Sequence, residues 1–399
     1  MKNKFIVGII SPLFLLLLFM NTVIAQQPCN DDAIMNTKGS WKKHSDSDLF
    51  PDKSFPKNQF PLVNSRIDKM QKLLQAAYPD PKGIEAVWYR SISGNALVEG
   101  GPVPYELSSL FLAYFCNTYT NKIEPGGETD TWFYVWANQL NWFAEHVKYY
   151  VIQKQPVYLL TPKIGEFNGY PLYKGLHNKN SNTGIAYSRS IIITRPGQSP
   201  YVPVTKKQFL KAFLNYNEKR FPKTLAAFEK NIVRTDEEEE ANKKKQLEKI
   251  ERTTAPDKIA RARDYFLRTY VTDKQSKEAS IAKIKKSHEE LMKPAQNLLA
   301  NSPEQELEQP AILDFDNLLE FKKFSTYEES RGQSVLHSGE GGRQLVRLNP
   351  DYFDSKLPRY VPQFLIVYWR WDKNKPAENF KNQLEANFNF RALKEMIDK

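Results

Sequence analysis

The side chains of this 399-residue sequence that could bind a metal are spaced unfavourably for a metal site. A zinc-binding helix needs a second histidine one turn after the first. His288-Glu289-Glu290 begins like such a helix, but Met292 occupies the position of the second ligand. No two of the five histidines stand at a ligand spacing, and these are His44, His146, His177, His288 and His337. We therefore expect no metal and no other cofactor.

Motifs for nucleotide, serine-hydrolase and calcium chemistry are also missing. The sequence has no Gly-x-x-x-x-Gly-Lys loop, no Gly-x-Ser-x-Gly turn and no His-Glu-x-x-His helix. Asp46, Asp48 and Asp52 fall on the first, third and seventh positions of a calcium loop. Pro51 replaces the glycine that this loop needs for its turn, so we expect no calcium site there.

Paired carboxylates remain as a route to catalysis. Asp314 with Asp316, and Asp351 with Asp354, are close pairs in the sequence. A glycosidase needs two carboxylates opposed across a cleft. Because the chain has 46 acidic residues, close pairs arise without function, and we expect these acids to be solvated. A hydrolase of a cell-envelope or extracellular polymer is therefore the alternative function, and we predict no catalytic residue.

Positive charge is the stronger functional signal. Lys and Arg number 57 against 46 acids, a net charge of +11, and most of the excess lies in residues 206–300. A basic face attracts an anionic surface. We expect an anion contact at Lys283, Lys285 and Lys286 on a helix, and at Arg343 after the glycine-rich loop His337–Gly342. The alternative is a solvated basic surface and a plain flexible loop.

The N-terminus has the pattern of a secretory signal. Lys2 and Lys4 precede an apolar run that is densest over Leu13–Met20. Residues 1–25 are read as a signal peptide, cleaved between Ala25 and Gln26. An uncleaved anchor is the other reading, and Pro12 argues against it. No later apolar run approaches the roughly 18 residues of a membrane span, so we expect a soluble protein in the periplasm or secreted, and no nucleic acid partner.

The chain has only two cysteines, Cys29 and Cys116. Both follow the signal peptide, and export favours disulfide formation. A bridge would close a long loop and attach the mature N-terminus to the first domain. Two unpaired thiols, with Cys116 buried in the apolar run that precedes it, are the alternative, and the sequence leaves the choice open.

Hydrophobic periodicity places these residues in three sections. Residues 26–205 read as a mixed α+β domain, with a helix from Leu62 and a hairpin turning at Asn168-Gly169. The aromatic segment 132–143 is expected to fill a core, with stacking on sugars or docking of a partner as the alternative.

Residues 206–300 read as a helical section. Thr205 with Gln208, and Thr235 with Glu238, form capping boxes that start helices. Pro222 and Pro256 are expected to interrupt, which gives two or three long helices. No heptad pattern persists beyond a few turns, so a coiled coil is left open.

Residues 301–399 return to mixed structure. Phe364–Trp371 is the strongest strand of the sequence, with Leu365, Val367, Trp369 and Trp371 expected on one face. A helical tail follows Pro376. The predicted class is α+β: a mixed strand and helix N-terminal part, a long-helix middle section and a small strand-plus-helix C-terminal part.

Two segments, Pro200–Leu210 and Tyr360–Trp371, resemble segments of uncharacterised exported bacterial proteins. The resemblance implies export and no particular activity. Together with the absent motifs, it favours an exported, soluble, non-catalytic binding or interaction protein. Its partner is expected to be an anionic envelope surface or another exported protein.

Overall fold

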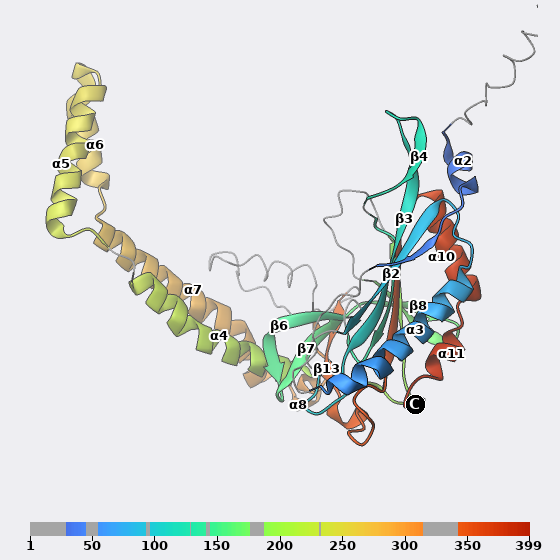
Figure 1. Cartoon of the computed structure of the whole chain (residues 1–399). Coiled ribbons are helices and arrows are strands. Elements are labelled where there is room, and N and C mark those ends of the chain that lie inside the picture. Colours follow the sequence, from blue (N-terminus) through green and yellow to red (C-terminus); the bar gives the residue numbers. More distant parts are fainter. Residues whose placement is uncertain are drawn as a thin grey trace, which may run out of the picture.

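The computed structural model describes residues 29–44, 55–92, 96–127, 129–140, 144–175, 187–230, 233–313 and 342–399 (Figure 1). This part of the chain combines two sheets, a helical layer and a projecting helical arm, which confirms the predicted α+β class. Several residues discussed above lie outside the described residues. These are the signal segment 1–25 with Gln26, Asp46, Asp48 and Asp52, His177, Asp314, Asp316, and His337 with the rest of its loop up to 341.

The larger sheet has nine strands and gathers segments from both ends of the chain. Its only parallel pair is β1 with β2, and the other neighbours are antiparallel. Strand β4 pairs only with β3. In spatial order the other strands are β1 (Trp41–Lys43), β2 (Ile84–Ile92), β3 (Tyr105–Asn117), β5 (Trp132–Ala137), β14 (Leu365–Trp371), β10 (Tyr187–Ile193), β9 (Tyr170–Lys174) and β8 (Lys163–Phe167), and β4 covers Lys122–Pro125.

The predicted hairpin is confirmed as β8 and β9. Asn168 and Gly169 both have positive φ, 51° and 77°. A type I′ turn needs positive φ at both central residues, and Asn and Gly reach it at the lowest cost. The turn therefore fixes the pairing of Phe167 with Tyr170.

Strand β14 lies in the middle of this sheet, between β5 and β10. The strand prediction is confirmed, and all seven of its residues are buried. Leu365, Val367 and Trp369 pack against the helical layer. Ile366 and Tyr368 pack toward the smaller sheet. The alternation is hidden because both faces of the strand are covered.

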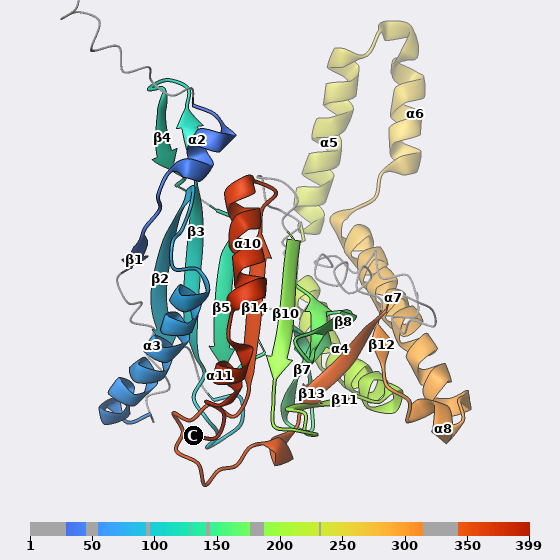
Figure 2. The same ribbon diagram turned by 90° about the vertical axis from the view of Figure 1, so that its right-hand side faces the viewer.

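Helices cover one face of the larger sheet (Figure 2). They are α2 (Asp31–Asn36), α3 (Phe60–Ala77), α10 (Lys375–Asn387) and α11 (Phe390–Lys394). The helix expected from Leu62 is α3, and its Ile67, Met70 and Leu74 side chains are fully buried there. Phe380 of α10 stacks on Phe111 of β3 with ring centroids 3.7 Å apart. The helical tail predicted after Pro376 is thus part of the main core.

The smaller sheet packs on the opposite face. Its antiparallel order is β11 (Tyr201–Pro203), β13 (Arg343–Leu348), β7 (Gln155–Leu160) and β6 (Ala144–Ile152), with β12 (Ile312–Leu313) added to β13. Tyr158 and Val346 share a core with Ile366 and Trp136. Because β13 and β14 complete sheets built from residues before 205, the sections 26–205 and 301–399 share one body.

Between β11 and β12 the chain forms an arm of two stacked helical hairpins (Figure 1). The inner hairpin pairs α4 (Lys206–Glu229) with α7 (Asp273–Asn301), and α8 (Glu304–Leu307) follows it. The outer hairpin pairs α5 (Asp236–Thr253) with α6 (Ile259–Thr269). Three short 3-10 turns, η1 (Lys57–Gln59), η2 (Pro256–Lys258) and η3 (Pro350–Tyr352), complete the described elements.

The capping boxes at Thr205 and Thr235 are confirmed. So is the break near Pro256, because α5 ends at Thr253. The expected interruption at Pro222 is wrong: α4 continues through it. A proline removes one backbone donor from a helix, and the packing of α4 along α7 compensates for that loss.

Cys29 and Cys116 are joined by a disulfide, with their Cα atoms 5.6 Å apart. The bridge closes a separation of 87 residues and attaches the segment before α2 to the end of β3. A cross-link over so long a loop removes much conformational freedom from the unfolded chain.

We expect Cys116→Ser to lower the free energy of unfolding by about 2–5 kcal/mol, the range for removing a native disulfide of this kind. Chemical denaturation of the mature protein measures it. Dithiothreitol should shift the midpoint of the wild type and leave that of the variant unchanged. Equal denaturation midpoints for wild type and variant in the absence of dithiothreitol would contradict the prediction.

Candidate functional site

The arm leaves and re-enters the body at one point of the smaller sheet. The Ala311 backbone N donates to the Val204 carbonyl at 2.8 Å, and the Lys206 backbone N donates to the Gln309 carbonyl at 2.9 Å. The whole excursion from α4 to α8 is therefore anchored by a short, paired root. Figure 1 shows the arm extending away from the sheets.

The apolar core of the arm is confined to the half nearest its root. Phe209, Leu210 and Phe213 of α4 are buried with Ala295 of α7 against Val157 of β7 and its neighbours. Farther out, the His288 ring stacks on the Phe221 ring, with ring centroids 3.9 Å apart. Burial lowers the pKa of this histidine. His288 thus packs as an aromatic ring between α4 and α7.

The outer hairpin has almost no core. In α5 and α6, the only buried residue is Glu239. Tyr265 is 70% exposed and Leu267 is 49% exposed, and Val271 just beyond α6 is 58% exposed. A two-helix hairpin that buries so little gains little stability from its own packing. These three apolar side chains are exposed at separate positions, because Tyr265 and Leu267 lie about 160° apart around α6.

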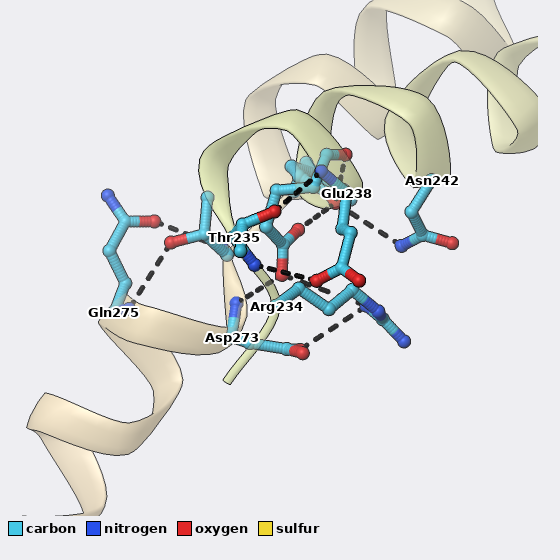
Figure 3. Close-up of polar contacts among 9 residues, drawn as sticks. Arg234, Thr235, Glu238, Asn242, Asp273 and Gln275 are labelled. Carbon is cyan, nitrogen blue, oxygen red and sulfur yellow. Dashed lines mark hydrogen bonds and ion pairs between the residues drawn. The ribbon is translucent and has the colours of Figure 1, made fainter. Parts of the chain in front are cut away.

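A polar cluster that we call the elbow joins the inner and outer hairpins (Figure 3). It consists of Arg234, Thr235, Glu238, Glu239, Tyr270, Thr272, Asp273 and Gln275, at the ends of α5, α6 and α7.

Glu239 lies at the centre of the elbow. Its carboxylate accepts hydrogen bonds from the Tyr270 hydroxyl at 2.5 Å and from the Asp273 backbone N at 2.8 Å. The Arg234 guanidinium lies 3.7 Å from the same carboxylate and 3.4 Å from that of Asp273. These hydrogen bonds hold the pKa of Glu239 below its usual range. One charged side chain thus connects three segments of the arm.

Two capping boxes define where the helices begin at this elbow. The Thr235 hydroxyl accepts from the Glu238 backbone N, while the Glu238 carboxylate accepts from the Thr235 backbone N. Thr272 and Gln275 repeat the arrangement at the start of α7. Sequence reasoning missed this second box, although its Thr-x-x-Gln spacing is the same signature. Each helix start is thus satisfied locally.

The lysines expected to contact an anion do not share one face. Lys283, Lys285 and Lys286 are exposed on α7. At about 100° per residue, Lys286 lies about 60° around the helix from Lys283, whereas Lys285 lies about 160° from it. Lys286 lies 3.9 Å from Glu290 in an ion pair. Lys283 and Lys286 therefore lie near each other on α7, while Lys285 lies on another side of the helix.

Arg343 lies elsewhere and is buried. Its guanidinium donates to the carbonyls of Leu159 and Leu160, both at 2.6 Å, within the smaller sheet. Burial lowers its pKa to about 10. The side chain points into the body and binds backbone carbonyls of β7, and the anion contact expected at this position stays a prediction.

The aromatic strand β5 faces two environments. Phe133 and Val135 enter the core beneath the helices, as expected. On the other face Trp132, Tyr134 and Trp136 stack along the strand, with centroid separations of 5.6 and 4.7 Å. The Trp136 indole Nε1 donates to the Glu106 carboxylate at 2.6 Å, and the Ser108 hydroxyl donates to it at 3.0 Å. Burial raises the pKa of Glu106.

The acids nearest this face can be compared with the spacing of a glycosidase pair. The nearest acid along β5 is Asp130, which is paired with Arg370 at 2.5 Å. Glu106 lies opposite Trp136, and Asp130 stands two residues before Trp132. The intervening strand from 132 to 136 spans about 13 Å at about 3.3 Å per residue. Glycosidase carboxylates lie about 5–9.5 Å apart, so Glu106 and Asp130 are too far apart to act as such a pair.

The remaining candidate residues are the carboxylates of Asp351 and Asp354 and the side chains that could bind a metal ion. Asp351 lies within η3, and Asp354 lies two residues after it, where its carboxylate accepts a hydrogen bond from the Lys356 backbone N in a local turn. In the described part of the chain, His, Cys, Asp and Glu side chains form no group of three that could hold a metal ion. Every helix described is too short or too polar to cross a bilayer.

We expect Glu239→Ala to loosen the elbow, because it removes the acceptor shared by Tyr270 and Asp273. Spin labels on Lys258→Cys at the tip of the outer hairpin and Lys223→Cys on α4 measure the distance between the two hairpins by double electron–electron resonance. The native cysteines are bonded and stay unlabelled. The distance distribution should be narrow in the unmutated elbow and broad in the variant. The neighbouring Glu240→Ala is the matched control, and equal broadening in both would contradict the assignment.

We expect Glu106→Gln to change how stability depends on pH. A raised pKa means that the folded state keeps its proton where the unfolded state has lost it. Wild-type stability should therefore fall as pH rises from about 4.3, the ordinary glutamate value, through the folded pKa. Glutamine removes this loss, so the variant should gain stability relative to wild type across that window. Urea midpoints over a pH series measure it, with exposed Glu166→Gln as control. Parallel curves for wild type and Glu106→Gln would refute it.

The arm and the sheet face are interpreted from their own contacts, because comparison with known proteins offers no guide. No protein-family model, curated protein or solved structure matches this chain.

Proposed function

We propose that this is an exported, non-catalytic binding or interaction protein and that the outer hairpin of its arm is the contact element. The observation that carries the proposal is the contrast between the body and the hairpin. The sheets bury large aromatic side chains on both faces, whereas α5 and α6 bury only Glu239. Because this projecting element contributes so little to the core, we assign it the role of contacting a partner.

Export is supported by two features. The first 25 residues have the order of a cleaved secretory signal, a basic start, an apolar run and a small residue at the cleavage position. The disulfide between Cys29 and Cys116 is compatible with an oxidising compartment, the periplasm or the outside of the cell. The resemblance of two short segments to exported bacterial proteins agrees with this destination.

The hydrolase alternative has less support. It requires two carboxylates opposed across a cleft. On the face of the larger sheet that carries Trp136, the Glu106 carboxylate accepts hydrogen bonds from the neutral donors Trp136 and Ser108. Near the start of β5, the Asp130 carboxylate forms an ion pair with Arg370. Their separation along β5 exceeds the range for such a pair. The partner is therefore better described as something bound than as something cleaved, and another exported protein or an anionic envelope surface fits this role.

A photo-cross-linking amino acid placed in the full mature protein tests the proposal. Probes replacing Tyr265 and Leu267 on the outer hairpin should form adducts in native envelope preparations. A probe at exposed Glu378 on α10 reports on the body and should form few. Adducts confined to the α10 position, or equal at all three positions, would contradict an arm-based contact.

A further inference from the structure

One flank of the outer hairpin combines basic side chains with an exposed tyrosine. We define the basic flank by Lys245 and Lys249 on α5 and by Arg261 and Tyr265 on α6. Lys245 and Lys249 are one turn apart, as are Arg261 and Tyr265, so each pair lies along one side of its helix. All four residues are exposed.

An ion pair on the other side of the hairpin shows that the two helices present these residues together. Glu251 of α5 and Arg263 of α6 meet at 2.8 Å and mark one flank. Lys249 lies about 160° around α5 from Glu251, and Arg261 and Tyr265 lie about 160° around α6 from Arg263. The basic flank is therefore the side opposite this ion pair.

Of the acids near the basic flank, Glu238 and Asp264 are engaged elsewhere, whereas Glu248, next to Lys249, and Asp257, one turn before Arg261, are exposed. The Glu238 carboxylate accepts from the Thr235 backbone N in the capping box. Asp264 pairs with Arg268 at 2.6 Å. Among the described residues, Lys245, Lys249 and Arg261 take part in no ion pair. Their charges remain available to an external anion, which surface lysines and arginines bind without losing much solvation.

We propose that the basic flank binds the surface of a bilayer that contains anionic phospholipids. This inference rests on the proposed function and names the partner of the same hairpin. Lysine and arginine near an anionic bilayer are attracted to its surface potential. Tyrosine is enriched at the level of lipid headgroups, where its ring is half-immersed and its hydroxyl is hydrated. Tyr265, 70% exposed beside Arg261, supplies that side chain.

The shape of the arm suits a flat partner. The 29 residues of α7 alone span about 43 Å at 1.5 Å per residue. The outer hairpin continues beyond them and lies farthest from the sheets (Figure 1). A bilayer cannot enter a groove, so a projecting hairpin with charge along one flank can lie on it while the body stays clear. A soluble acidic polymer would use the charges and leave Tyr265 in water.

Co-sedimentation with vesicles tests the inference. The full mature protein should bind vesicles containing phosphatidylglycerol at low salt and not pure phosphatidylcholine vesicles, and binding should weaken as ionic strength rises. The triple variant K245E/K249E/R261E should reduce the partition coefficient by about 100-fold or more, because each basic residue contributes about fivefold. Tyr265→Ser should weaken binding at high salt as well, since its contribution is not ionic.

The matched control is K283E/K285E/K286E on α7, which makes the same change in net charge on another exposed part of the arm. It should retain most of the binding. Equal losses in both triple variants would show that net charge alone is responsible and overturn the site. Binding to soluble polyglutamate without binding to vesicles would overturn the lipid assignment while leaving the cross-linking result at the arm intact. Circular dichroism checks folding, and glutamine variants replace any glutamate variant that fails to fold.

Discussion

The arrangement of this protein depends on a set of three backbone hydrogen bonds where three chain segments meet. The Val204 N donates to the Leu345 carbonyl, the Leu345 N to the Ala311 carbonyl and the Ala311 N to the Val204 carbonyl, all within 2.9 Å. All three residues are fully buried. Because the start and end of the arm are bonded to each other and to β13, the excursion between them can be long without disturbing either sheet. The entropic cost of closing such a loop grows only slowly with its length.

The parts of this fold that sequence reasoning predicted are those decided by near neighbours. A capping box needs a residue three positions away, and the Asn168-Gly169 turn needs only its own two φ angles. Sheet order is decided by distant partners. Strand β14 pairs with β5, some 230 residues earlier along the chain. The hydrophobic periodicity within β14 does not indicate which strand is its partner. Its burial on both faces follows from the same distant contacts, which the sequence of β14 alone does not reveal.

The candidate site shows the same division. Lys283, Lys285 and Lys286 look like a patch in the sequence, but a helix distributes neighbouring residues around its axis. The residues that do share a flank are one turn apart and lie on two helices. Glu239 is one member of an acidic run, and nothing local separates it from Glu240. Its role arises from Tyr270 and Asp273, which are more than thirty residues away.

Stability is distributed unevenly along the arm, and this decides what a bound partner can change. The root and inner hairpin share the apolar core with the smaller sheet, whereas the outer hairpin depends on the elbow and on exposed ion pairs such as Glu251 with Arg263. Exposed ion pairs contribute little to stability. The outer hairpin is joined to the rest of the molecule through the two crossings at the elbow. Glu239 contacts both crossings, Arg234 on one and Tyr270 and Asp273 on the other, so a change in the position of the hairpin relative to the body has to alter these contacts.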